Sequence, residues 1–109
     1  MIERYRLEKD LVKAVNAARP ILRRKFKLEI WRQNTGALKQ NKRFIRFGIV
    51  GAADFTGIMK GKRVEIECKA AKGKQSDNQK AFQKMIEKHS GIYILAYSVQ
   101  DIIEALEKE

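Results

Sequence analysis

The sequence predicts an α/β domain in which helices flank a mixed β-sheet. Three observations support this fold class. Residues 3–19 follow the pattern of an amphipathic helix, several strand-like runs lie between residues 28 and 70, and a second helix leads into the apolar run 92–97. A tight turn joins strands that pair antiparallel, whereas a helical crossover into a buried strand is typical of parallel pairing. We therefore expect a mixed sheet.

The first helix carries an apolar stripe and precedes the only proline of the chain. The stripe residues fall on one helical face and are Tyr5, Leu11, Val12, Val15 and Ala18. Pro20 lacks a backbone N–H and its ring clashes with the preceding helical turn. We therefore expect the helical pattern to end or to be interrupted there.

Four runs are predicted to form strands, namely residues 28–36, 44–50, 53–59 and 62–70, with a polar loop at 37–43. The first run begins with alternating apolar and polar residues, which is typical of a half-buried strand. Trp31 lies in this run, and we expect it in the core rather than at the surface as a platform for stacking bases. Lys60 and Gly61 separate the last two runs, and a two-residue connection with glycine second favours a tight hairpin turn.

Capping signals mark the two helices of the C-terminal half. Ser76 and Gln79 form the S-x-x-Q pattern of a capping box at the start of a helix that Gly91 ends. Residues 92–97 are almost all apolar, which is typical of a central strand buried on both faces. Ser98 caps the last helix, and its inward-facing residues are predicted to be Ile102, Ile103 and Leu106.

Length and composition limit the class of protein. The 109 residues suit a single domain, 1–109, and 44% of them are apolar, which is enough for a folded core. One cysteine and one histidine exclude an internal disulfide and the usual Cys/His zinc sites, and a Ser-His-Asp or Cys-His mechanism would depend on His89 alone. No apolar run has the ~18 residues of a membrane span and the N-terminus is charged, so we expect a soluble intracellular domain.

The chain is strongly basic, with 24 Lys and Arg against 13 Asp and Glu and a net charge of +11. Basic residues cluster at 19–27, 39–46 and 60–74. Such a surplus repels itself unless an anion neutralises it, which favours a polyanionic partner such as the phosphate backbone of a nucleic acid. The alternative is a solvated basic face that only aids solubility.

The turn at Lys60 and Gly61 also predicts which side chains face one another. With this turn, counting back along both strands places Asp54 opposite Glu67, and Lys69 lies on the same face as Glu67. Two opposed carboxylates repel, and a divalent cation between them removes the repulsion; oxygen ligands favour Mg²⁺ or Mn²⁺ over zinc. A lysine beside such an ion can stabilise charge on a phosphate, so the set points to phosphodiester hydrolysis.

Structural interpretations of these residues stay open. Glu67 and Lys69 could form an ordinary ion pair on an exposed face, and a register slip of one residue would turn Asp54 to the other side. Glu65 could be an additional outer ligand of the ion, but we expect it to be a solvated neighbour. Glu8 interrupts the apolar stripe of the first helix, where a carboxylate is costly unless it is paired or bound to a metal, although a glutamate at the edge of the stripe can also reach solvent.

Three further residues have competing or purely structural interpretations. Gln79 either completes the Ser76 cap or points its amide into the carboxylate patch, and the sequence alone favours the cap. Cys68 is expected in the core. His89 is expected at the surface, where it complements the dipole at a helix C-terminus.

Asp54, followed by Glu67-Cys68-Lys69, resembles the D…(D/E)-x-K signature of the PD-(D/E)XK nuclease superfamily. The segments 31–37, 46–58, 64–82 and 91–96 together resemble a stand-alone VRR-NUC domain, the virus-type replication-repair nuclease, over nearly the whole chain. The resemblance implies a restriction-endonuclease-like core with the element order α-β-β-β-α-β-α. Ala53 stands where the name of the superfamily has proline, but residues 51–54 fit the G-x-x-D form of such domains.

The resemblance also implies roles by position. The catalytic residues would be Lys69, Gln79 and Glu8, and the ligands of one or two Mg²⁺ or Mn²⁺ ions would be Asp54, Glu67 and the backbone carbonyl of Cys68. Charge clustering adds candidate phosphate-binding residues, namely Arg32, Lys39, Lys42, Arg43, Arg46, Lys72 and Lys74.

The implied function is that of a metal-dependent, structure-selective DNA endonuclease. Compact VRR-NUC proteins are similar to Holliday-junction resolvases, which act as homodimers on branched DNA. Such proteins are associated with phages and bacteria, which implies a cytoplasmic location in a bacterial or phage-infected host cell. The alternatives are a flap or nicking nuclease of the same fold, a catalytically silent nucleic-acid-binding domain and a small DNA-compacting protein.

Overall fold

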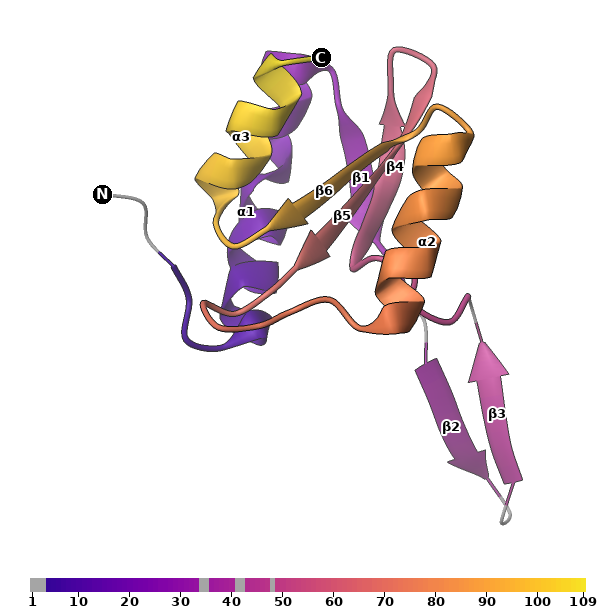
Figure 1. Ribbon diagram of the computed structural model, residues 1–109. Coiled ribbons are helices and arrows are strands. Elements are labelled where there is room, and N and C mark those ends of the chain that lie inside the picture. Colours follow the sequence, from indigo (N-terminus) through magenta and orange to yellow (C-terminus); the bar gives the residue numbers. More distant parts are fainter. Residues whose placement is uncertain (1–3, 34–35, 41–42, 48) are drawn as a thin grey trace.

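The structure, a computed structural model, describes residues 4–33, 36–40, 43–47 and 49–109, with the side chains of 36–40 and 43–47 outside this description. Figure 1 shows the elements in chain order: α1 (Glu8–Phe26), β1 (Glu29–Arg32), β2 (Gly36–Gln40), β3 (Arg43–Phe47), β4 (Phe55–Met59), β5 (Lys62–Cys68), α2 (Asp77–Lys88), β6 (Ile92–Ala96) and α3 (Val99–Glu107). No helix in these described ranges combines the length and apolar composition that a membrane crossing requires.

Four strands form an open mixed sheet in the order β1-β4-β5-β6. β4 pairs antiparallel with β1 and with β5, whereas β5 and β6 are parallel. The prediction of an α/β domain with a mixed sheet flanked by helices is therefore confirmed. The helices and the strands of this sheet follow one another as α-β-β-β-α-β-α, with β2 and β3 inserted after β1.

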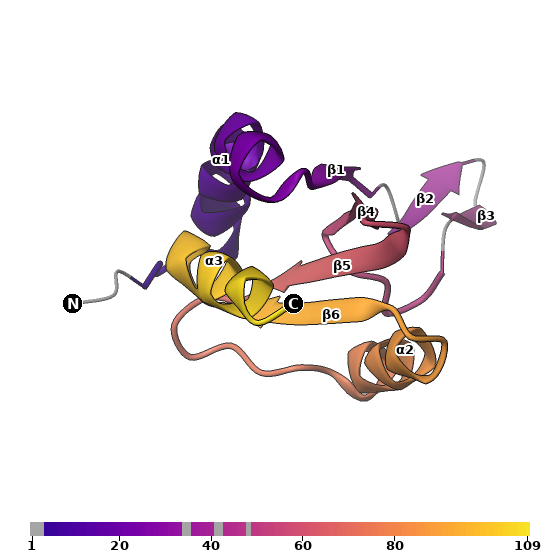
Figure 2. The same ribbon diagram turned by 90° about the horizontal axis from the view of Figure 1, so that it is seen from above.

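The sheet is the middle of three layers. Figure 2 shows α1 and α3 on one face and α2 on the other. The larger core lies between the sheet and the α1/α3 layer, and its fully buried members include Leu11, Leu22, Phe55, Ile66 and Ile102. A smaller cluster of Ala53, Phe82 and Ile86 fills the space under α2. Burial of these apolar side chains is the main force that holds the layers together.

The β4–β5 hairpin has the predicted register. Met59 pairs with Lys62 and Phe55 with Ile66, so counting from the turn was correct along the whole ladder. Lys60 and Gly61 both have positive φ angles, of 52° and 78°. Two consecutive positive φ angles are those of a type I′ turn, whose twist matches that of the paired strands.

The expectation that α1 ends or is interrupted at Pro20 is wrong. The helix contains Pro20 and continues to Phe26. Lys27 ends it with a φ of 57°, and the backbone N–H of Lys27 donates a hydrogen bond to the carbonyl oxygen of Arg23. Leu22 continues the apolar stripe beyond the proline and is fully buried. Because Pro20 itself lies on the exposed side, the burial of Leu22 outweighs the missing backbone hydrogen bond.

The segment between β1 and β4 differs from its prediction. Residues 37–43 were expected to be a loop, but β2 covers most of them and pairs antiparallel with β3, so that both lie outside the four-stranded sheet (Figure 1). The run 44–50 was expected as one strand, and β3 covers only its first part. A polar segment can form a strand when a neighbouring strand provides hydrogen-bond partners for its backbone N–H and C=O groups. The composition of the segment does not reveal whether such a neighbour exists.

The two edges of the described sheet correct two further expectations. β6 was predicted to be a central strand, but it has one sheet neighbour, β5; its side chains are buried or half-buried because α2 and α3 pack against it. Trp31 was expected in the core, but it is 48% exposed. It lies on β1 at the other edge, while α2 packs against β6.

Replacing Pro20 by alanine is expected to raise the free energy of unfolding by about 1–2 kcal/mol. Alanine restores the missing N–H of the helix, and the gain is reduced because the unfolded chain becomes more flexible. Urea unfolding followed by circular dichroism measures the change. Arg24→Ala on the exposed side of α1 is the control and is expected to be nearly neutral. A destabilised Pro20→Ala variant would contradict the assignment of an uninterrupted α1.

Candidate functional site

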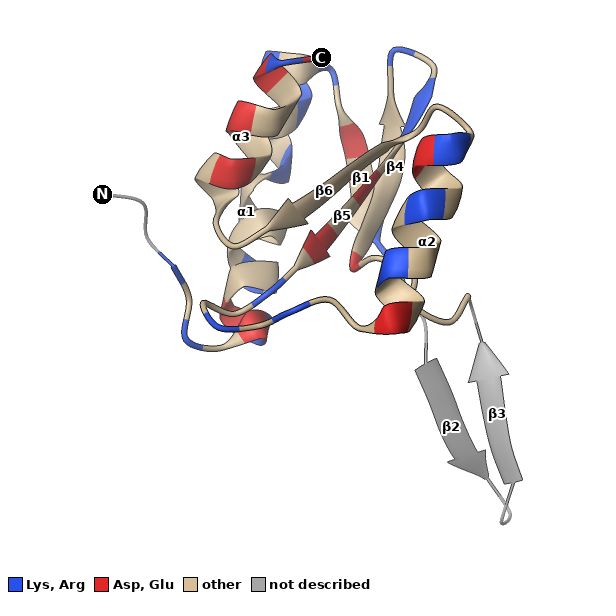
Figure 3. Ribbon diagram, in the orientation of Figure 1, with Lys and Arg blue, Asp and Glu red and all other residues tan. Residues whose placement is uncertain are grey.

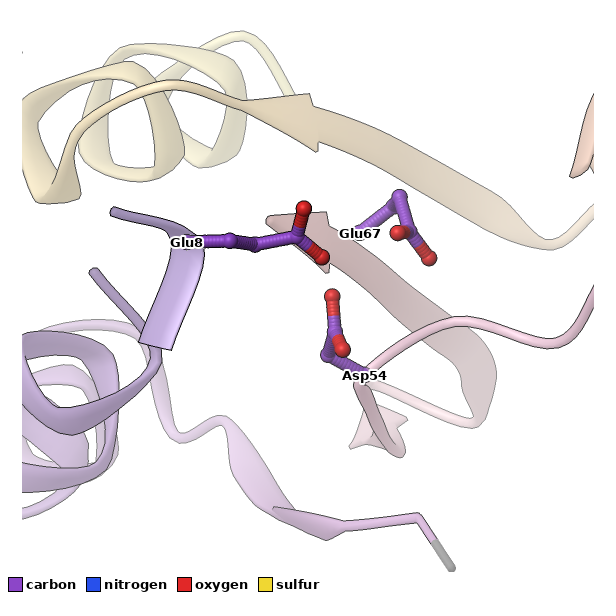
Figure 4. Close-up of side chains that lie close together, drawn as sticks. All are labelled: Glu8, Asp54 and Glu67. Carbon is purple, nitrogen blue, oxygen red and sulfur yellow. The ribbon is translucent and has the colours of Figure 1, made fainter. Parts of the chain in front are cut away.

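Three carboxylates from separate elements meet at one end of the sheet. Glu8 lies in the first turn of α1, Asp54 directly precedes β4, and Glu67 is near the end of β5. Each offers an oxygen within 4.8 Å of the others, and Figure 4 shows the three side chains pointing toward one another. The structure thus brings together the three acidic residues singled out in the sequence.

Backbone contacts fix the position of Asp54. Its carbonyl oxygen accepts hydrogen bonds from Gln33 N (2.9 Å) and from Arg32 Nη1 (2.9 Å) at the end of β1. Its carboxylate Oδ2 accepts from the backbone N–H of Cys68 (2.8 Å) on β5. Asp54 is therefore held between the two neighbours of β4, and its carboxylate lies beside the strand that carries Glu67.

The turn before Asp54 packs against the start of α2. Gly51 has a φ of 82°, and a Cβ built on it would lie 2.3 Å from the carbonyl oxygen of Asn78. Only glycine accommodates both this backbone conformation and this close approach. The contact places the segment that leads to Asp54 next to the helix that carries Gln79.

Glu67 is the most buried of the three acids, with 2% of its surface exposed. Its Oε2 accepts a hydrogen bond from Gln79 Nε2 (2.9 Å) and lies 3.8 Å from Lys69 Nζ. Among the described residues, its Oε1 is buried without a hydrogen-bond partner. Burial, and after it the Asp54 carboxylate, raises the pKa of Glu67 from 4.5 to about 8, against the opposing effect of Lys69.

Gln79 performs both functions that the sequence presented as alternatives. Its Oε1 accepts from the backbone N–H of Ser76 (2.9 Å), and its own N–H donates to Ser76 Oγ (3.1 Å), which completes the capping box. The amide group of the same side chain donates to Glu67. Because an amide carries an acceptor and a donor at one end, the cap and the contact with the cluster are compatible.

Lys69 and Glu8 complete the cluster. The side chain of Lys69 is largely buried, and its Cδ lies 3.3 Å from where a Cβ on Gly73 would be. Glu8 is partly exposed, and burial raises its pKa, with Lys69 opposing the shift and Asp54 adding to it. The expectation that Glu8 is costly on its helix face unless it has a partner therefore fits its environment.

Cys68 occupies the core, as expected. The side chain is fully buried on the face of β5 opposite Glu67. Burial, and then the carboxylates of Asp54 and Glu67, raise the pKa of its thiol, which disfavours the thiolate. Its backbone N–H binds Asp54, and the metal contact of its carbonyl oxygen stays a prediction.

The structure describes only some of the side chains that were predicted to bind phosphate. Arg32 lies at the cluster itself, with Nη1 3.3 Å from Asp54 Oδ1 and its guanidinium 5.5 Å from the centre of the Phe55 ring. Lys72 and Lys74 are exposed on the loop after β5, and Figure 3 shows blue stretches along this loop. The side chains of Lys39, Lys42, Arg43 and Arg46 lie outside the described residues. Phosphate binding by these residues stays a prediction.

The sequence analysis misjudged Glu65. It was expected to be solvated, but it is fully buried, accepts a hydrogen bond from Thr56 Oγ1 and pairs with Arg63 Nε at 2.9 Å. Its Oε1, like that of Glu67, has no partner among the described residues. The predicted register already placed Thr56 opposite Glu65, and this pairing could have indicated a hydrogen-bonded, buried glutamate. An unpartnered oxygen alone therefore does not single out Glu67, whereas its convergence with Asp54 and Glu8 does.

The donor set of the cluster fits a hard divalent cation. Carboxylate oxygens are the preferred ligands of Mg²⁺ and Mn²⁺. Opposite ligands of one Mg²⁺ lie about 4.2 Å apart, which is close to the separation of up to 4.8 Å among these oxygens.

Searches of protein-family models, curated proteins and solved structures gave no match for the chain. The geometry of the cluster is therefore the basis for assigning a function.

Replacing Glu67 by glutamine is expected to stabilise the metal-free protein at pH 8 by about 1–3 kcal/mol, because the neutral amide avoids the cost of a buried, partly paired charge beside Asp54. Because the pKa of Glu67 is raised in the folded state, the native protein loses stability as the pH rises from about 4.5 to about 8. The variant lacks this loss, so the two proteins should be similar at pH 5. Thermal unfolding in EDTA at both pH values measures the difference.

The matched control for this experiment is Glu104→Gln on the exposed side of α3, which should change neither value. A Glu67→Gln variant that is less stable than the native protein at pH 8 would show that Glu67 is satisfied without a cation.

Proposed function

We propose that this protein is a divalent-metal-dependent nuclease that hydrolyses phosphodiester bonds in DNA. The observation that carries the proposal is the convergence of Glu8, Asp54 and Glu67 within 4.8 Å. Three carboxylates this close repel one another, and the desolvated Glu67 is the most affected. Such an arrangement is costly for a structural role and useful for holding a cation.

Asp54, Glu67 and Glu8 would hold the ion, which, when bound, would supply a Lewis acid for the phosphate. Asp54 is suited to this role because its position is fixed by backbone contacts to both neighbours of β4. Gln79 orients Glu67 through a hydrogen bond to one oxygen and leaves the other oxygen available. Partners of this kind fix the geometry of ligating carboxylates.

Lys69 is the candidate for stabilising the charge that develops on the phosphate. Its ammonium group lies 3.8 Å from Glu67 Oε2. An ammonium group has three N–H donors, so contact with the carboxylates leaves N–H groups for a phosphate. In a largely buried position a cation stabilises a developing negative charge more strongly than it does in water. Lys69 would also orient the water that attacks the phosphorus.

The charge of the chain supports a nucleic acid as the substrate. The net charge of +11 attracts a polyanion at long range. Basic residues lie along both segments that lead to the acidic cluster, namely the loop after β5 and the N-terminal segment, as Figure 3 shows. A cation held there would remove the local repulsion between the carboxylates and a phosphate.

The resemblance to VRR-NUC domains extends the proposal to the fold and the substrate. In this proposal the core is restriction-endonuclease-like, and the preferred substrate is branched DNA such as a four-way junction. Symmetric paired cuts need two active sites and therefore a homodimer. Flap or nicking activity is the alternative specificity, and labelled junction, flap and duplex DNAs tested in parallel distinguish them.

Asp54→Asn is expected to reduce cleavage to background while DNA binding is kept or improved, because a ligand and a negative charge are removed. Lys69→Met should lower the cleavage rate about 10²–10³-fold, as removal of a charge-stabilising donor does. Cleavage by the native protein should require Mg²⁺ or Mn²⁺ and stop in EDTA. Gel assays of cleavage and anisotropy assays of binding measure these outcomes.

The control for this series is Glu104→Gln, which should cleave at the native rate. Cleavage by Asp54→Asn at the native rate would overturn the assigned centre. Metal-independent binding by the native protein, without cleavage of any of these DNAs, would favour a catalytically silent nucleic-acid-binding domain.

The two functions of Gln79 are expected to separate in a pair of variants. Ser76→Ala removes the hydroxyl of the cap and should cost about 1 kcal/mol of stability without slowing cleavage. Gln79→Glu keeps an acceptor for Ser76 N but removes the donor to Glu67, so cleavage should fall about 10–100-fold while α2 stays capped. Chemical unfolding and cleavage rates test both. Equal cleavage by the two variants would leave Gln79 with only the cap.

A further inference from the structure

A basic pocket lies next to the acidic cluster. The pocket has a volume of about 420 Å³, and its lining comprises Arg4, Arg6, Ala70, Ala71, Lys72 and Gly73. Of these described residues, three are cationic and none is acidic. Arg4 and Arg6 lie outside the basic clusters recognised in the sequence, and the proposed reaction centre does not use them.

Two chain segments form the walls of this pocket, and both lead directly into the proposed centre. The N-terminal segment continues from Arg6 to Glu8, and two residues span at most about 7 Å of chain. The other wall follows Lys69, whose aliphatic stem packs against Gly73. A hydrogen bond from Ala71 N to Tyr5 O (2.9 Å) joins the two walls, which lie side by side in Figure 3.

Tyr97 contacts both walls of the pocket. Its hydroxyl donates a hydrogen bond to the carbonyl oxygen of Gly73 (3.0 Å). The guanidinium of Arg4 lies over its ring, with 4.9 Å between Arg4 Cζ and the ring centre. A guanidinium that stacks on an aromatic ring keeps its in-plane N–H groups available for hydrogen bonds. Arg4 is therefore held in place with donors that remain available to an anion.

We propose that this pocket binds a phosphate group of the same DNA strand that is cut at the acidic cluster. This inference rests on the proposed function, because it takes the cluster as the place of cleavage. The described lining offers two arginines and a lysine, which suit a phosphate because arginine binds it through paired N–H donors. The phosphate is either an internal one near the scissile bond or a terminal one at a strand end.

The test compares DNA binding by Arg4→Gln/Arg6→Gln with binding by Arg24→Gln/Lys108→Gln. Both double variants remove two positive charges, and in the described part of the chain Arg24 and Lys108 are exposed and form no ion pair. The probes are flap DNAs that carry a fluorophore at the 3′ end and either a 5′-phosphate or a 5′-hydroxyl. Anisotropy is measured in EDTA over a range of salt concentrations, so binding is scored whether or not the protein cleaves.

The pocket variant is expected to bind at least about tenfold more weakly than the control variant. Its log affinity should also depend less steeply on log salt, by about 0.9 for each phosphate of duplex DNA that the variant no longer neutralises. Weaker binding confined to the 5′-phosphorylated probe identifies a terminal phosphate, and equally weakened binding of both probes identifies an internal one. Equal binding by the two double variants overturns the proposal.

Lys72→Gln tests the same pocket from its other wall and should weaken binding in the same direction. This single variant keeps the test decisive if the double variant folds poorly. Because binding in EDTA is independent of cleavage, a nuclease-inactive protein with a functional pocket would refute the proposed function and leave phosphate binding in place.

Discussion

The antiparallel pairing of β4 with β5 is the constraint on which the candidate site depends. The two-residue turn at Lys60 and Gly61 sets its register, and this register extends to Phe55 and Ile66, directly beside Asp54 and Glu67. Side chains alternate between the two faces of a strand, so a slip of one residue would turn one acid into the core. The buried apolar residues of β5 on the opposite face prevent such a slip.

The same pairing buries two glutamates of β5, Glu65 and Glu67, and their surroundings differ. Glu65 is satisfied in part by Thr56 and Arg63 within the sheet. Among the described residues, Glu67 instead faces two other carboxylates and accepts a hydrogen bond from the amide of Gln79, with Lys69 Nζ 3.8 Å away. The interactions of Glu65 are those of a structural ion pair, whereas Glu67 lies beside two further carboxylates, an arrangement that a cation could stabilise.

The sequence was informative wherever local chemistry determines the structure. Turn chemistry at Lys60-Gly61 and the capping box at Ser76 were both predictable because they depend on a few adjacent residues. The burial of Glu65, the exposure of Trp31 and the passage of α1 through Pro20 were not, because each depends on which element packs where. The convergence of Asp54 and Glu67 followed from register, while the contribution of Glu8 required the packing of α1 against the sheet.

The three carboxylates come from separate elements, which links the candidate site to the tertiary fold. Glu8 comes from α1, Asp54 from the turn that packs on α2, and Glu67 from the sheet, so their oxygens meet only when all three layers are assembled. An unfolded chain offers no such set, and a cation would therefore bind the native state preferentially and stabilise it by mass action. The repulsion among the carboxylates works in the opposite direction when no cation is bound. If the proposed function holds, the stability of the fold and the readiness of the site would therefore depend on the same cation.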